Sequence, residues 1–146
     1  MSAPTIDEYG TKRYFNEQGQ LHRTDGPAVE YADGTKAWYV NDKLHRTDGP
    51  AYEWADGSKS WYVNGKLHRT DGPACEYADG GKSWWVNDQR HRPDGPAVEW
   101  ADGSKSWCVN GQYLTEEQFN AQYGQQQPSL DITLIINGET YKLTKQ

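Results

Sequence analysis

The sequence predicts an all-β protein: an elongated, single-layer antiparallel sheet of tandem 23-residue β-hairpin repeats, followed by a short helix and a terminal hairpin. Two observations support this prediction. The segment "LHRTDGPAYEWADGSKSWYVNGK" (44–66) recurs with few changes in four successive copies, and a fixed period of this length is typical of repeat architectures. Within each copy, polar residues alternate with β-branched and aromatic ones between turn signals, which is the period of a half-buried strand.

The repeats divide the chain into successive parts. We expect a β-repeat array over 1–112, with a partial repeat at 9–20 and full repeats at 21–43, 44–66, 67–89 and 90–112. A capping helix is expected at 113–124, a linker at 125–129 and a β-hairpin at 130–146.

Each repeat contains three turn signals. "ADGS" or "ADGT" and "VNGK" or "VNDK" supply residues that tolerate the positive φ of tight hairpins. The third bend is "TDGPA", in which the Asp is expected to accept an Asx-type hydrogen bond from its own turn. The strands lie between these turns, in "AVEYA", "KSWYV" and "LHR". A two-stranded unit then advances the sheet by about 10 Å.

Aromatic residues supply most of the expected burial. The chain has 7 Trp and 10 Tyr but only 2 Phe, and its mean hydropathy of -1.06 is strongly polar. Rings stacked from repeat to repeat can cover one another where a single sheet has no second layer. The repeat places them in three rows: Trp38, Trp61, Trp84 and Trp107; Tyr31, Trp54, Tyr77 and Trp100; Tyr39, Tyr62, Trp85 and Cys108.

The C-terminal segment departs from the repeat. In "YLTEEQFNAQYG", Thr115 is a candidate N-cap with Gln118 three residues later, and Gly124 a candidate stop. Repeat arrays need an atypical end that covers the last exposed face, so we expect this helix to cap the array. The alternating segment around Asn137 and Gly138 predicts the terminal hairpin. It either extends the sheet or forms a separate contact element.

The amino-acid sequence of the repeat resembles that of a known family. The 23-residue unit with "WYVNGK" and a closing "ADG" is similar to a MORN repeat, and "HR-x-DGPA-x-E" resembles the MORN-variant repeats of bacterial and phage proteins. The resemblance covers residues 9–112. It implies an open β-sheet that scaffolds or binds, and some bacterial relatives are antitoxins.

Composition and charge narrow the function classes. The net charge of -6 argues against nucleic acid or an anionic membrane as the main partner. No apolar run is long enough to span a bilayer and no signal peptide is evident. Cys75 and Cys108 stand where other repeats have Val, Tyr or Trp. This indicates substitutions at packed positions rather than a disulfide framework. We therefore expect a cytoplasmic protein.

The repeated polar residues predict structure rather than catalysis. Equivalent His residues are expected about 10 Å apart, too far for one metal ion. Each Glu of "AVEYA" is expected to pair with the Lys across the Asp-Gly turn, as Glu53 with Lys59. Active sites are unique, whereas these residues recur in every repeat. We predict no catalytic residue, metal or cofactor.

The aromatic rows predict a binding function. Strand alternation puts Trp61 and Tyr62 on opposite faces, so an open sheet exposes one set of rings, and an exposed apolar patch marks an interaction surface. We predict a non-enzymatic protein-binding module, and the resemblance implies an inhibitor or antitoxin that occupies the surface of a host or defence protein. The alternatives are carbohydrate binding and self-association, including a homodimer. The predicted contact residues are Tyr39, Tyr62, Trp85, Arg46 and Arg69.

Overall fold

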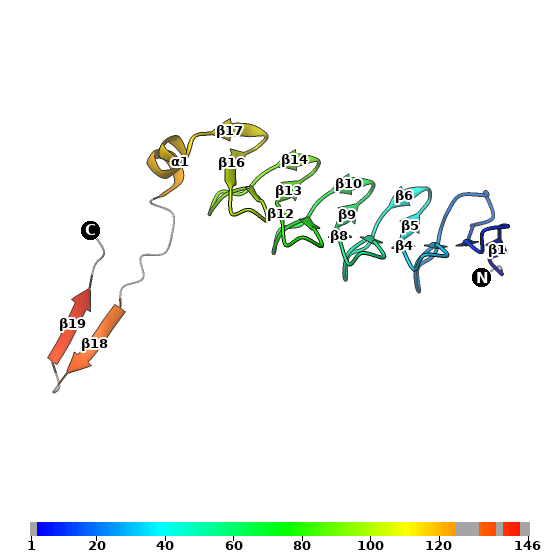
Figure 1. Cartoon of the computed structure of the whole chain (residues 1–146), viewed down its shortest axis with the longest axis horizontal. Helices are drawn as coiled ribbons and strands as arrows, with labels where there is room; N and C mark the ends of the chain where they lie inside the picture. Colours follow the sequence, from blue (N-terminus) through cyan, green and yellow to red (C-terminus); the bar gives the residue numbers. More distant parts are fainter. Residues whose placement is uncertain (1–2, 125–131, 137–138, 144–146) are drawn as a thin grey trace.

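The computed structural model describes residues 3–124, 132–136 and 139–143, with side chains over 3–124. Over these residues it confirms the predicted fold class. Antiparallel hairpins follow one another in a long open row that ends at a short helix (Figure 1). The partner of each hairpin is the next one along the chain, so the array grows only by neighbour contacts, as in other repeat proteins.

Eleven strands of the described chain pair in one sheet, and each repeat adds two of them. In order they are β1 (Thr5–Ile6), β2 (Lys12–Arg13), β3 (Val29–Glu30), β4 (Lys36–Ala37), β7 (Tyr52–Glu53), β8 (Lys59–Ser60), β11 (Cys75–Glu76), β12 (Lys82–Ser83), β15 (Val98–Glu99), β16 (Lys105–Val109) and β17 (Gln112–Leu114).

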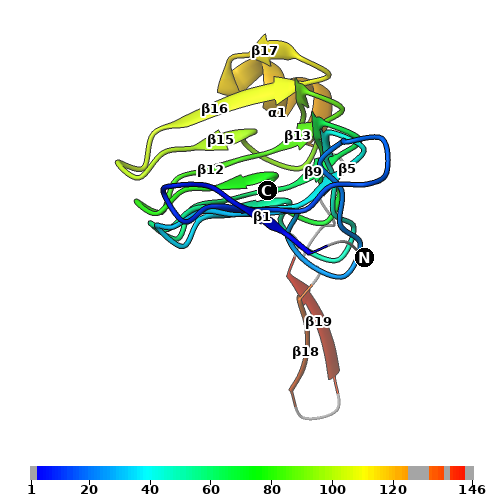
Figure 2. The ribbon, with the colours of Figure 1, turned by 90° about the vertical axis from the view of Figure 1, so that its right-hand side faces the viewer.

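A second row of hairpins runs beside this long sheet. It consists of β5 (Tyr39–Val40) with β6 (Lys43–Leu44), β9 (Tyr62–Val63) with β10 (Lys66–Leu67), and β13 (Trp85–Val86) with β14 (Gln89–Arg90). Seen along the array, the long sheet and the second row extend in different directions (Figure 2).

The segment "KSWYV" therefore differs from the expected single strand. In the second full repeat it breaks at Trp61 into β8 and β9. The Trp61 N–H donates to the Ala74 carbonyl of the next repeat at 2.8 Å, while its carbonyl accepts from the His68 N–H of its own hairpin at 3.0 Å. Because the two backbone groups bond in different rows, the chain turns a corner at this residue. Only β16, in the last repeat, continues through the equivalent position, Trp107.

The hairpin turns have the conformations that the sequence predicts. In the second full repeat, Gly57 has φ of 91° in the Asp-Gly turn, and Asn64 and Gly65 have φ of 52° and 79° in the Asn-Gly turn. The Asn-Gly turn therefore has positive φ at both central positions, which is characteristic of a type I′ hairpin, whereas in the Asp-Gly turn the Gly has positive φ and the Asp does not.

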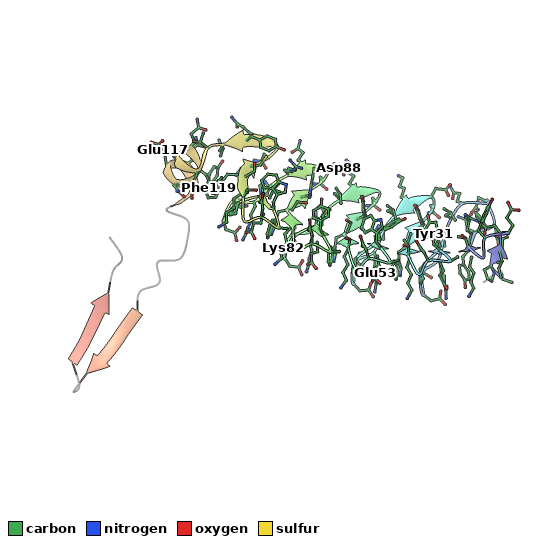
Figure 3. All side chains as sticks on the ribbon, viewed as in Figure 1. Tyr31, Glu53, Lys82, Asp88, Glu117 and Phe119 are labelled. Atoms are coloured by element: carbon green, nitrogen blue, oxygen red, sulfur yellow. The ribbon has the colours of Figure 1, made fainter. Side chains whose placement is uncertain are left out.

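The long sheet has one charged face and one inner face. On the charged face Glu and Lys alternate from strand to strand, so that Glu53 lies between Lys36 and Lys59. On the inner face Tyr52 lies between Ala37 and Ser60, and both of these are buried. Glu53 and Lys82 point to the same side of the array in Figure 3. The Ala of each "DGPA" bend has no exposed surface: Ala28, Ala51, Ala74 and Ala97.

Backbone bonds also join successive hairpins of the second row. The Arg46 N–H donates to the Tyr62 carbonyl at 3.1 Å, and the Gly65 N–H donates to the Leu44 carbonyl at 2.8 Å. His45 adds a side-chain bond, because its Nδ1 accepts from the Asn64 N–H at 3.1 Å. Equivalent bonds recur along the array, so the His of "HRTDG" joins one hairpin to the next.

The Asp-Gly turns contribute a further hydrogen bond between repeats, from a backbone N–H to a side-chain hydroxyl. The Thr35 and Ser58 hydroxyls accept from the N–H groups of Ala55 and Ala78 at 3.1 and 3.0 Å. The repeat that contains Gly81 has no hydroxyl at this position.

Replacing Gly81 by serine is expected to raise the free energy of unfolding by about 1 kcal/mol, through lower chain entropy in the unfolded state and one added hydrogen bond. Its backbone is not in the positive-φ region, and the new Cβ would meet Asp79 Oδ1 at 3.1 Å. At the equivalent positions of the other repeats, Thr35, Ser58 and Ser104 each donate a backbone N–H to the Asp two residues earlier. Urea unfolding of Gly81→Ser and Gly81→Ala separates the two contributions. A serine variant no more stable than the alanine variant would show that the added bond is absent.

The predicted short C-terminal helix is confirmed, but it is shorter than the expected 113–124, because residues 113 and 114 belong to β17. Helix α1 (Glu116–Tyr123) begins after the N-cap Thr115 and ends at Gly124, with the reciprocal Thr115–Gln118 capping box. It contacts β16 and β17, the last strands of the sheet, and its Phe119 is only 3% exposed.

The strands of the terminal hairpin are also present. β18 (Ile132–Ile136) and β19 (Glu139–Leu143) pair antiparallel in a sheet of their own. The expected linker at 125–129 and the Asn137-Gly138 turn lie outside the described residues. Cys75 and Cys108 are buried and free, as expected of packed positions.

Candidate interaction surfaces

The structure places the predicted aromatic contacts in one row of half-buried rings. Tyr39, Tyr62 and Trp85 begin the first strand of successive second-row hairpins. The Trp85 indole N–H donates to the Ser83 hydroxyl at 2.8 Å, which seats this ring over the inner face of the long sheet. Burial, with Cys75 and Tyr77 among its polar neighbours, raises the pKa of Tyr62. These rings therefore cover the inner face and keep part of their surface open.

A second aromatic row is more exposed. Trp54, Tyr77 and Trp100 are 39%, 50% and 47% exposed, each just before an Asp-Gly turn. Tyr52, on the inner face, contacts this second row: its ring centroid lies 4.4 Å from that of Trp54 and 6.5 Å from that of Tyr31. We call the two rows together the aromatic face: Tyr31, Trp54, Tyr77 and Trp100 with Tyr39, Tyr62 and Trp85.

Tyr52 is a partly buried phenol with a raised pKa. Burial, followed by a hydrogen bond with Tyr31, raises the pKa of Tyr52 from 10.0 to about 12. A raised pKa in the folded state means that this contribution to stability is complete below pH 10 and is lost as the pH rises through about 12.

We therefore expect the unfolding midpoint to fall between pH 10 and 12, and to fall less steeply in Tyr52→Phe. Tyrosinate absorbance should show that the highest-titrating phenol is missing from this variant. Identical pH profiles for the two proteins would contradict the assignment.

The predicted contacts Arg46 and Arg69 do not join Tyr39 and Tyr62. Their guanidinium carbons lie 4.2 Å and 4.0 Å from the ring centroids of Trp38 and Trp61. These Trp residues precede Tyr39 and Tyr62 in an extended segment, so they face the opposite side. The two arginine side chains are 23% and 22% exposed. The contact role of all five residues stays a prediction.

Each arginine of "HRTDG" is the centre of a network within its repeat. Arg46 Nε donates to Asp48 at 2.8 Å, and Arg46 NH1 donates to the Pro50 carbonyl and to Glu53, both at 3.2 Å. Arg69 forms the same bonds with Asp71, Pro73 and Glu76. The same network recurs at Arg23 and Arg92.

This network differs from two expectations. Glu53 lies opposite Lys59 in the register, as expected, but the ion pair within 4.0 Å is with Arg46. The Asp of "TDGPA" accepts from this arginine, whereas the Asx bond occurs in the other turn, where Asp56 accepts from the Ser58 N–H at 2.8 Å. The planar guanidinium reaches several oxygens at once, which a Lys amine cannot do in the same geometry.

Between successive "HRTDG" bends lies a line of open pockets that we call the bend groove. Each pocket has a Trp and a Val inside and a bend on either side; Trp61 and Val63 line the central one, of 630 Å³. The bend at Arg46–Asp48 borders two pockets, as does the bend at Arg69–Asp71, so the pockets follow one another without interruption.

Sequence reasoning did not single out the exposed Trp54 row or the bend groove as contact surfaces. The position of Trp54 directly before the Asp-Gly turn was a usable signal, since a ring at the end of a hairpin has few neighbours to cover it. The groove had no such signal, because it depends on the distance between bends in different repeats.

Among the described residues, no three His, Cys, Asp or Glu side chains gather as metal ligands. Within the same residues, no helix has the length and apolarity to cross a membrane. No family model matches the chain, and comparison with curated proteins returned no similar sequence.

Proposed function

We propose that this protein is a non-enzymatic repeat module that binds another protein through its aromatic face. The observation that carries the proposal is the exposure of Trp54, Tyr77 and Trp100 at 39%, 50% and 47%, in successive repeats. Trp and Tyr are the residues that most often dominate binding energy at protein interfaces. Such an exposed aromatic row is far more than the scattered apolar residues of an ordinary surface.

Rigidity supports the same proposal. Tyr62 and Trp85 are half-buried, and the indole of Trp85 is fixed by its hydrogen bond to Ser83. Backbone hydrogen bonds between repeats hold the rows at a constant spacing. A preorganised surface loses little conformational entropy on binding. We infer that the module acts by occupation of its partner's surface, and the resemblance to MORN-variant repeats favours an inhibitor or antitoxin directed at a host or defence protein.

The test is affinity capture with matched variants. Tagged full-length protein is passed through bacterial lysate, and the partner that stays bound in stoichiometric amount is identified and purified. Trp54→Ala/Tyr77→Ala tests the exposed row, and Tyr62→Ala/Trp85→Ala tests the predicted half-buried row. Each truncation at a binding hot spot is expected to cost about 2 kcal/mol or more of binding free energy, which is about thirtyfold in Kd.

Lys59→Ala and Lys82→Ala are the control, because both lysines are exposed on the charged face. Unchanged binding by both aromatic variants, with wild-type circular dichroism, would overturn the aromatic face as the contact surface.

A carbohydrate-binding module is the second candidate, and the exposed Trp54 and Trp100 rings favour it because flat rings stack on sugars. This candidate requires that isolated protein bind glycans, which the inhibitor proposal does not. Light scattering with size-exclusion chromatography tests self-association, including a homodimer, in the same preparations.

A further inference from the structure

The bend groove is a second periodic surface, on the opposite side of "KSWYV" from the aromatic face. Trp38, Trp61 and Trp84 line its successive pockets. Each ring carries an arginine on one side, and that arginine is about four-fifths covered; the Arg69 side chain, for example, is 22% exposed. Two arginines also line each pocket, and the charge of each is already paired with two carboxylates of its own repeat.

The exposed charge at the groove is acidic. Asp48, Asp71 and Asp94 stand on successive bends, with 81%, 81% and 77% of their side chains exposed. The neighbouring guanidinium lowers the pKa of Asp48 and of Asp71, so both are ionised at neutral pH. An apolar floor below an anionic rim fits Lys and Arg side chains, whose stems are apolar and whose heads are cationic.

The spacing of the pockets selects the backbone of the ligand. Equivalent residues of successive repeats are two strands apart in the long sheet, as β7 and β11 are, which corresponds to about 9.6 Å. A polyproline II helix turns once in three residues and rises about 9.3 Å, so every third side chain returns to the same face. Its misfit is therefore about 0.3 Å per repeat.

Other backbones fit this spacing less well. In a β-strand, side chains return to one face about every 6.6 Å. An α-helix needs two turns, or about 10.8 Å, and its misfit then grows by about 1.2 Å with each repeat. Over three pockets only the polyproline II period keeps a side chain above each Trp.

We propose that the bend groove binds a polyproline II segment that carries Lys or Arg at every third residue. The basic side chains lie across Trp38, Trp61 and Trp84 with their charged ends at Asp48, Asp71 and Asp94. Aromatic-lined grooves are a common docking surface for proline-rich segments, because such segments are already extended before they bind. This surface and its ligand are separate from those of the aromatic face.

The test uses full-length protein and three labelled peptides in fluorescence anisotropy. The first has four Lys-Pro-Pro triplets; the second has the same residues in the order Lys-Lys-Pro-Pro-Pro-Pro-Lys-Pro-Pro-Pro-Pro-Lys; the third has Glu in place of Lys in the triplets. We expect the first to bind at least about tenfold more tightly than the second, because only its lysines reach successive pockets together, and the third not to bind. The comparison needs no variant, so misfolding cannot obscure it.

Variants then locate the site. Asp48→Asn/Asp71→Asn keeps the oxygen that accepts from each arginine but removes two rim charges, and is expected to weaken the first peptide about tenfold. Asp33→Asn/Asp56→Asn removes the same charge at the exposed Asp-Gly turns, where asparagine also makes the Asx bond. It should change Kd by less than about twofold.

Several outcomes would overturn the proposal. Equal binding of the first two peptides, or equal loss in both Asn variants, would mean attraction to the net charge of -6 alone. Absence of binding by all three peptides, or preference for the Glu peptide, would also overturn it. Trp54→Ala/Tyr77→Ala should leave peptide binding unchanged, so failure here is distinguishable from failure of the aromatic face.

Discussion

Replacing Phe119 by alanine is expected to lower the free energy of unfolding by about 3–5 kcal/mol. Phe119 is 3% exposed and is the buried residue through which α1 covers the end of the sheet at β16 and β17. Its ring also stacks on Tyr123 at 5.5 Å. In a repeat array the terminal cap protects the last repeat from solvent, so loss of this ring is expected to uncover the end of the sheet at β16 and β17.

Urea unfolding followed by tryptophan fluorescence measures this change, and hydrogen exchange shows where it acts. We expect the amides of β16 and β17 to lose protection first, with smaller changes at β7 and β8. Gln122→Ala is the control on the same helix, because this side chain is exposed and should change stability by no more than about 0.5 kcal/mol. A uniform loss of protection over all repeats would contradict the local role of the cap.

Arg46→Ala is expected to cost about 3 kcal/mol, because it removes bonds to Asp48, Pro50 and Glu53 and the contact with Trp38. Gly49→Ala should cost about 2 kcal/mol through the same arginine. A Cβ on Gly49 would lie 2.9 Å from the Arg46 guanidinium carbon, and its φ lies outside the positive region that strains other residues. The steric conflict is therefore with Arg46 rather than with the backbone.

A double-mutant cycle tests this explanation. In the Arg46→Ala background, Gly49→Ala should cost close to nothing, so the coupling is about 2 kcal/mol. Additive losses would show that Gly49 is required for another reason. Lys59→Ala serves as the charge control and is expected to change stability by less than about 0.5 kcal/mol, because its side chain is exposed on the charged face.

Several features were predictable because their signals are local. The Asp-Gly and Asn-Gly turns need residues that accept positive φ, and the sequence places them at Gly57, Asn64 and Gly65. The capping box of Thr115 and Gln118 is readable as four consecutive residues. Alternation along "KSWYV" predicts that Trp61 and Tyr62 face opposite sides, and in the structure Trp61 lines the bend groove whereas Tyr62 belongs to the aromatic face.

The candidate sites were less predictable, because they depend on atoms that are distant in sequence. Nothing near Glu53 indicates that Arg46 approaches more closely than Lys59, since the register supplies the Lys and the fold of the bend supplies the Arg. Likewise, the Gly of "TDGPA" looks like a turn glycine, yet Gly49 leaves room for a side chain three residues earlier. The Nδ1 of His45 accepts from the Asn64 N–H in the next hairpin of the second row, 19 residues away.

The amino-acid sequence by itself determined the repeat, its turns, its alternating faces and its terminal helix, because each depends on backbone conformation over a few neighbouring residues. Only the tertiary structure decided that Trp61 divides a strand between two rows and that the arginines lie flat on Trp rings. It also decided that successive bends enclose a groove. Those features arise from distances between repeats, which depend on how strands stack and turn relative to one another in space.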